Sequence, residues 1–131
     1  MAKITSTIGK TLYKIEITSP SGNTLIADEP LENGGQNSGF SPKELLASSL
    51  AACTSATLMM YANHKGMDLQ AITIEIDLER DEDANKTVIN RKIELTGSLS
   101  EEQKSRLLVV ANKCPVHKIL SNPIEINTSL D

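Results

Sequence analysis

Apolar residues alternate with polar ones in short segments near the N-terminus. Lys3–Thr7, Thr11–Thr18 and Thr24–Ala27 are predicted strands, and the Pro- and Gly-containing stretch Ser19–Asn23 has the composition of a tight turn between the last two. Glu32–Gly39 has no periodicity and contains three glycines, so it is predicted to be a loop. Because it directly precedes the most apolar segment, we expect this loop to form a wall or lid of a site.

The next segment has the signals of a long helix. Ser41 suits the N-cap, Pro42 the first helical position and Glu44 the third, and Gly66 supplies a stop, so the helix is predicted to run from Pro42 to about His64. Its residues are apolar over most of the circumference. Such a helix is buried on several sides, which in a small domain favours packing against a second copy of the chain.

Two long strands and a second helical region follow. Leu69–Arg80 and Thr87–Thr96 place branched apolar residues at alternate positions and predict a hairpin across a charged turn. Ser100 and Gln103 form a second capping box, opening a helix that runs to about Asn112.

The C-terminal segment completes the predicted order of elements. Cys114 is the predicted N-cap of a short helical turn, because Pro115 suits its first position. Ile124–Thr128 is predicted as a last strand. The order β-β-β-α-β-β-α-α-β, with hairpins segregated from long helices, indicates an α+β fold with the long helix packed on an antiparallel sheet.

The length of 131 residues fits one domain, residues 1–131. We expect N-terminal strands and loop over residues 1–40, the central helix over 41–66, and the remaining strands and helices over 67–131. The N-terminus has no signal-peptide pattern, and no stretch comes near the length of about 20 apolar residues that spans a bilayer. A cytoplasmic protein without a membrane partner is therefore expected.

Charge and aromatic content argue against a nucleic-acid partner. The net charge is -4, and aromatic residues make up 2% of the chain, so neither a basic surface nor a stacking platform is available.

The two cysteines, Cys53 and Cys114, are the candidate reactive groups. In a reducing compartment, such residues are either inert core residues or redox and catalytic thiols. Cys53 lies in the middle of the predicted long helix, on a stripe with Ser49 and Thr57. Two interpretations stay open there: a small apolar core residue, or a buried reactive thiol in an apolar pocket.

Cys114 has the more activating local sequence. A thiol at a helix N-cap, with Lys113, His117 and Lys118 close by, is expected to ionise more readily than one in mid-helix. A zinc site formed by both cysteines with His64 and His117 is an alternative. No second paired motif supports it, and His64 lies about three helical turns from Cys53, so no metal or other cofactor is predicted.

Taken together, these motifs resemble the OsmC/Ohr family of osmotically inducible and organic hydroperoxide resistance proteins. The resemblance spans the chain in order and is carried by Gly39–Leu46, Leu50–Thr54, Tyr61–Gly66, Leu99–Leu108 and Lys113–Lys118. It implies an intertwined α+β homodimer with sites at the subunit interface. It also implies that Cys53 attacks an organic hydroperoxide, that Cys114 resolves the sulfenic acid as a disulfide, and that a dithiol reductant restores the pair.

The chain departs from the family's peroxidases around the attacking thiol. Those proteins pair an arginine from the N-terminal half with a glutamate directly after the helix-start proline. Here Lys43 follows Pro42, with Glu44 one place later, and all three arginines lie after Cys53: Arg80, Arg91 and Arg106. Candidate supporting residues are Lys43, Glu44, Ser49, Thr57 and His117.

The leading prediction is thus a thiol-dependent hydroperoxide reductase. Two alternatives stay open: a non-peroxidase that binds apolar small molecules in the same cleft, and a thiol redox sensor.

Overall fold

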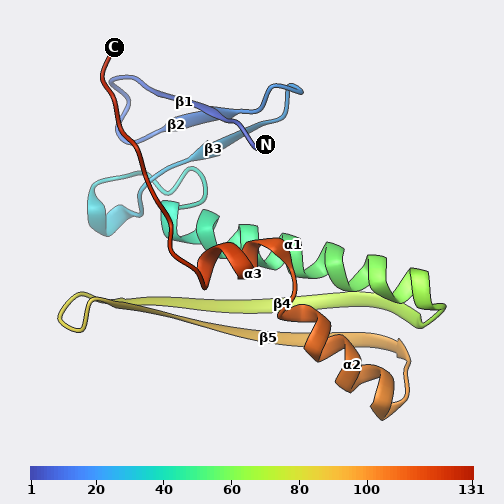
Figure 1. Cartoon of the computed structure of the whole chain (residues 1–131). Coiled ribbons are helices and arrows are strands. Elements are labelled where there is room, and N and C mark those ends of the chain that lie inside the picture. Colours follow the sequence, from blue (N-terminus) through green and yellow to red (C-terminus); the bar gives the residue numbers. More distant parts are fainter. The chain divides into compact units, whose positions relative to one another are not determined.

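A computed structural model describes the whole chain. The elements, in chain order, are β1 (Thr5–Ile8), β2 (Ile15–Thr18), β3 (Thr24–Ala27), the 3-10 turn η1 (Leu31–Asn33), α1 (Pro42–Lys65), β4 (Asp68–Asp81), β5 (Lys86–Ser98), α2 (Glu101–Ala111) and α3 (Pro115–Leu120) (Figure 1). They form two compact units, Met1–Leu46 and Ala47–Asp131. The organisation as a single domain stays a prediction.

The first unit is a three-stranded antiparallel meander, β1-β2-β3, followed by a loop. The buried carboxylate of Asp28 organises that loop, because it accepts hydrogen bonds from the backbone N–H groups of Tyr13, Glu29, Gln36 and Ser38 and from the Ser38 hydroxyl. A loop with few apolar residues thereby acquires a fixed path. Strand β2 is shorter than predicted and begins at Ile15.

Helix α1 begins and ends where the local signals predict. The Ser41 hydroxyl accepts from the N–H of Glu44, and the Glu44 carboxylate accepts from the N–H of Ser41 at 2.8 Å, which completes the predicted capping box. Gly66 follows the helix with φ of 69°.

Burial of α1 is confined to one stripe. The buried residues recur every fourth position: Leu50, Thr54, Leu58 and Ala62. Within the chain α1 is buried on one side only, and Met60 is 70% exposed, so the predicted burial on further sides against a second copy stays a prediction. By length and composition alone α1 could also cross a bilayer, contrary to the prediction, with a mean hydropathy of 1.4 in its most apolar window. The core helix of a soluble protein meets the same criterion.

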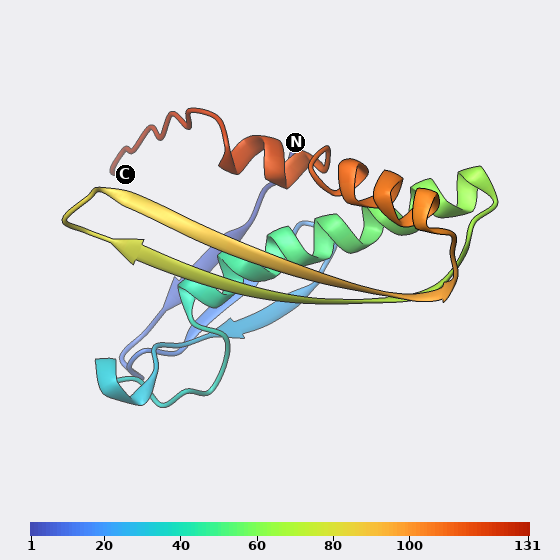
Figure 2. The same ribbon diagram turned by 90° about the horizontal axis from the view of Figure 1, so that it is seen from below.

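Strands β4 and β5 form the predicted long antiparallel hairpin (Figure 2). On its half-buried face Ile72 pairs with Leu95 and Ile74 with Ile93, so cross-strand neighbours on this face are mostly branched apolar residues. Gly97 is required at the end of β5, because a Cβ there would lie 2.0 Å from the carbonyl oxygen of Asp68.

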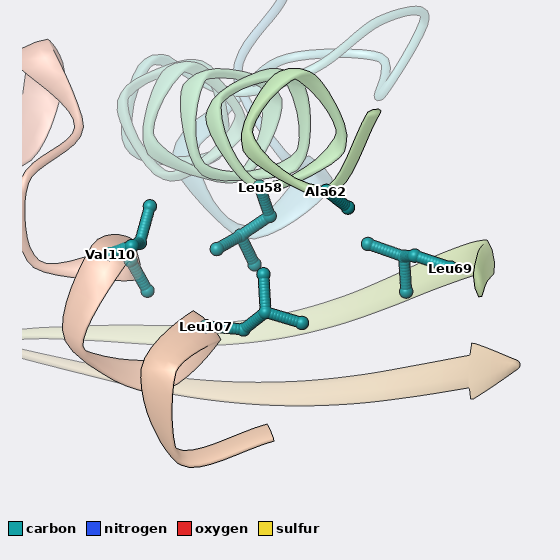
Figure 3. Packing of buried hydrophobic residues seen from close by; sticks show 6 residues of the cluster. Leu58, Ala62, Leu69, Leu107 and Val110 are labelled. Atoms are coloured by element: carbon teal, nitrogen blue, oxygen red, sulfur yellow. The ribbon is translucent and has the colours of Figure 1, made fainter. Parts of the chain in front are cut away.

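The core of the second unit lies between its helices and the hairpin. Figure 3 shows side chains from α1, β4 and α2 pointing toward one another. The buried cluster consists of Leu58, Ala62, Leu69, Leu107, Val110 and Ala111, and Ile72, Ile93 and Leu95 pack against it from the hairpin. This core fixes α2, and through it the start of α3, against α1.

One predicted element is absent. Residues after Asn122 form no strand, and Ile124 and Ile126 are 57% and 82% exposed. A strand needs a hydrogen-bonding partner, and no strand of this chain pairs with the segment. The α+β class, the antiparallel sheets and the long helix are confirmed, and homodimerisation stays a prediction.

Candidate active site

Cys114 lies where α2 and α3 meet, as the N-cap of α3. Its side chain is fully buried, and its Sγ accepts a hydrogen bond from the backbone N–H of His117 at 3.3 Å. Pro115, at the first helical position, has no N–H that needs a partner. The Cys114 sulfur caps the N–H of His117, at the third position. The predicted N-cap role of Cys114 is confirmed.

Cys53 meets Cys114 although the two are distant in the chain. It lies beside the buried stripe of α1 and is half-buried, so the expectation of a buried thiol at this position is wrong. The Cys53 side chain lies close enough to the Cys114 sulfur to lower the pKa of the Cys114 thiol. The fold thus brings together one partly accessible thiol and one enclosed thiol.

Thr54 is the buried residue of α1 that faces Cys114. Its Oγ1 lies 3.7 Å from the Cys114 sulfur and 2.7 Å from the carbonyl oxygen of Leu50. It also accepts a hydrogen bond of 2.9 Å from the guanidinium of Arg91. One hydroxyl therefore connects a cation, a thiol and the backbone of the preceding helical turn.

Arg91 extends from the apolar face of the hairpin, where it pairs with Ile76. Besides Thr54, its guanidinium donates to Oδ1 of Asn112 at 2.9 Å and contacts Nδ1 of His117 at 3.3 Å. An arginine has no acceptor, so Nδ1 of His117 must accept, and its proton lies on Nε2. Neutral groups therefore surround a fixed positive charge.

These contacts act on the ionisation of Cys114. Burial of the thiol raises its pKa, but the N–H of His117, the hydroxyl of Thr54, the Cys53 thiol and the charge of Arg91 each lower it. The lowering contributions prevail, and the pKa of Cys114 falls below its ordinary value. The expectation that Cys114 has an acidifying environment is thereby supported.

A pocket of about 460 Å³ opens beside this cluster. Its polar lining consists of Thr87, Arg91, Asn112, His117 and Ser121. Its apolar lining consists of Leu50, Ile89, Ile93, Leu108 and Leu120. A ligand here would place apolar groups against the hairpin and a polar end near Arg91.

The other predicted site residues have different surroundings. His117 is part of the cluster, through both its backbone and its ring. Lys43 and Glu44 belong to the first unit, and the Glu44 carboxylate caps α1. Ser49 is exposed and Thr57 is half-buried on the same stripe as Cys53. No group of three or more His, Cys, Asp or Glu side chains comes together in a way that could hold a metal ion, so the zinc alternative gains no support.

Two residues of the cluster, Thr54 and Arg91, were not predicted. A signal for Arg91 was present, since it occupies the position between Ile89 and Ile93 on the apolar side of an alternating strand. A charged residue in such a place needs a partner in the interior. Thr54 carried no signal beyond its position next to Cys53.

Comparisons with known proteins agree with this fold. The structure is similar to an osmotic stress induced and detoxification response protein from Psychrobacter arcticus 273-4, with 26% identity over 91% of this chain and 88% of that chain and a TM-score of 0.79. It is also similar to OhrB, the organic hydroperoxide resistance protein of Bacillus subtilis, with 25% identity over 91% and 89% and a TM-score of 0.63. An OsmC-like protein from Mycoplasma pneumoniae shares the fold, with 23% identity over 92% and 87% and a TM-score of 0.78.

Comparison with curated proteins gives no significant match. The family model described as OsmC-like protein matches residues 35–129, a span that contains both cysteines, Thr54, Arg91 and His117. The chain belongs to the OsmC-like protein family.

Proposed function

We propose that this protein reduces organic hydroperoxides with the thiol pair Cys53 and Cys114. The observation that carries the proposal is the proximity of the two thiols: Cys53 lowers the pKa of Cys114, and Arg91 reaches the same cluster through Thr54. Resemblance to a protein named for organic hydroperoxide resistance adds to it.

In the proposed cycle Cys53 attacks first. Its sulfur takes the terminal oxygen of the peroxide, the O–O bond breaks, and the products are a sulfenic acid on Cys53 and an alcohol. The sulfur of Cys114 then attacks the sulfenic sulfur, which forms a disulfide and releases water. A dithiol reductant then reduces the disulfide and regenerates both thiols.

Accessibility supports this order of events. Cys53 is half-buried, whereas Cys114 is fully buried, so a peroxide reaches the sulfur of Cys53 more readily. Cys114 needs to reach only the neighbouring sulfur. An enclosed thiol suits resolution, because its partner is supplied within the protein.

The pocket beside the cluster favours an apolar peroxide. Half of its lining residues are branched aliphatic side chains from the hairpin and the helices, and its polar lining includes Arg91. Hydrogen peroxide would gain nothing from such walls, whereas an alkyl or aryl hydroperoxide would bury apolar surface there. We also propose a cytoplasmic homodimer as the working form.

Consumption of cumene hydroperoxide with dithiothreitol as reductant tests the proposal. The wild-type protein should turn over, and Cys53→Ser should fall to the rate of the uncatalysed reaction. With no reductant added, Cys114→Ser should consume about one equivalent and then stop, because its sulfenic acid has no resolving thiol. Ser55→Ala, a substitution on the same helix, is the control and should keep the wild-type rate.

Equal slow consumption by wild type and Cys53→Ser would contradict the proposal. In that case the pocket favours a second function, the binding of an apolar small molecule without chemistry. Ligand binding that is unchanged in Cys53→Ser, together with no turnover, would identify it.

A further inference from the structure

The hydroxyl of Thr54 lies within hydrogen-bonding distance of three groups but has a single hydrogen to donate. A threonine hydroxyl has one O–H to donate and can accept at its lone pairs. Arg91 can only donate to it, and the carbonyl of Leu50 can only accept from it, whereas the thiol of Cys114 can do either. The state of Cys114 therefore decides where the single hydrogen of Thr54 points.

The two charge states of Cys114 give two arrangements. When Cys114 is a thiol, its S–H donates to Thr54, and Thr54 donates to Leu50 at 2.7 Å. When Cys114 is a thiolate, it accepts from the N–H of His117, the thiol of Cys53 and the hydroxyl of Thr54. In both states the hydrogen bond from Arg91 keeps Thr54 in place.

Arg91 has no carboxylate partner to neutralise it. The ion pairs of the structure join Arg80 to Glu82 and Lys104 to Glu101. Glu75, Asp77 and Lys92 share a surface pocket with Arg91, but none of them forms an ion pair with it.

The side chains of charged or titratable residues that act on the Cys114 sulfur are Arg91 from β5 and Cys53 from α1, while His117 from α3 acts through its backbone N–H. Lys113 and Lys118 are its neighbours in the chain. Since the histidine accepts from Arg91 through Nδ1, it is neutral in this arrangement. The thiolate of Cys114 is thus the anion that fits beside the guanidinium of Arg91.

We infer that Thr54 and Arg91 hold the negative charge of the thiol pair on Cys114, and that this thiolate is the base that deprotonates Cys53 during its attack on the peroxide. The inference rests on the proposed function. It assigns Cys114 a role before resolution, and it makes Thr54 and Arg91 positioning residues.

The proton that leaves Cys53 is carried by Cys114 to the alcohol product. The proton of Cys53 moves to the sulfur of Cys114 as the sulfur of Cys53 bonds to the terminal peroxide oxygen and the O–O bond breaks. The proton then passes from Cys114 to the leaving alkoxide, which departs as the alcohol. Cys114 is again a thiolate, ready to attack the sulfenic sulfur and displace hydroxide, which takes a proton from solvent as water.

A titration without peroxide tests where the charge resides. In Cys53→Ser protein, Cys114 is the only cysteine, so the ultraviolet absorbance of its thiolate gives its titration midpoint directly. Arg91→Gln and Thr54→Val should each raise that midpoint, by about one pH unit or more for the arginine. Arg91→Lys keeps the charge without the planar fork and should lie between. Lys92→Gln and Ser55→Ala are the controls, and circular dichroism checks each fold.

Unmoved midpoints in folded Arg91→Gln and Thr54→Val proteins would overturn the charge assignment, even if Cys53-dependent turnover is observed. Shifted midpoints with no peroxide consumption would leave that assignment standing and defeat the proposed function instead. The base role has its own measurement, the rate at which Cys53 is first oxidised in a single turnover. Cys114→Ser should slow this first step at neutral pH, and an unchanged rate would overturn the role.

Discussion

Asp28 is a residue whose charge stabilises its surroundings. The hydroxyl of Ser38 lowers the pKa of the Asp28 carboxyl most, burial raises it, and the N–H groups of Ser38, Glu29 and Tyr13 lower it, which brings it from 3.8 to about 2. Because the folded pKa lies below the unfolded one, the resulting stability is fully present above about pH 4. It is lost as the pH falls through about 2.

Asp28→Asn should therefore lower the melting temperature at neutral pH, because a neutral amide replaces a charged acceptor and one of its ends can only donate. The difference from wild type should shrink between about pH 4 and pH 2, as the wild-type carboxylate takes up a proton. Thermal unfolding followed across this range measures it. Asp83→Asn, in the exposed hairpin turn, is the control, and equal melting curves for the two variants would refute the assignment.

At the residue scale, the two reactive cysteines could be predicted from the sequence, but the side chains that surround them could not. Cys53 and Cys114 are visible because cysteine is rare and each lies in a distinctive helical context. Arg91 became part of the cluster through strand pairing and helix packing, and no local rule links it to residues 26 and 37 positions away. The expected activating residues near Pro42 were inferred from relatives, whereas the cation beside Cys114 comes from β5.

At the scale of elements, helix boundaries were the most predictable feature. Capping boxes at Ser41 and Ser100 and the proline after Cys114 act over three or four residues, so the sequence shows them directly. The last strand was mispredicted for the opposite reason. Alternation at Ile124 and Ile126 gives a strand-like pattern, but pairing depends on a partner strand that the local pattern does not reveal.

The cap of α2 gives a quantitative prediction for an element. Ser100→Ala removes the side chain that accepts from the N–H of Gln103 at 3.1 Å and should reduce the free energy of unfolding by about 1 kcal/mol. Ser105→Ala, the same change inside the same helix, should be neutral or slightly stabilising, since alanine is the better helix former. Chemical denaturation measures both, and equal losses would show that Ser100 is not acting as a cap.

At the scale of the whole molecule, much apolar surface is uncovered. The large apolar side chains that are at least half exposed in the second unit include Met60, Leu108, Ile119, Ile124 and Ile126. A soluble monomer rarely leaves such a set open to water, so we expect another copy of the chain to cover part of it. Dimerisation would also complete the burial of α1 that its composition predicts.

Met60→Glu should therefore shift the protein toward monomer, because a carboxylate on α1 would have to be buried in the interface. Light scattering coupled to size exclusion should give twice the chain mass of 14.2 kDa for wild type and a lower value for the variant. Asn63→Glu, on an exposed position of the same helix, is the control. A wild-type protein that is monomeric with its fold intact would contradict the dimer.

The central claim is that Cys53 and Cys114 form one redox couple. Its most direct test is mass spectrometry of the reduced protein after one equivalent of cumene hydroperoxide, with peptide mapping under non-reducing conditions. We predict the loss of two hydrogens per chain and a cross-linked peptide that joins Cys53 to Cys114. Two free, alkylatable cysteines after peroxide has been consumed, or a sulfinic acid on Cys53 with Cys114 untouched, would contradict the account.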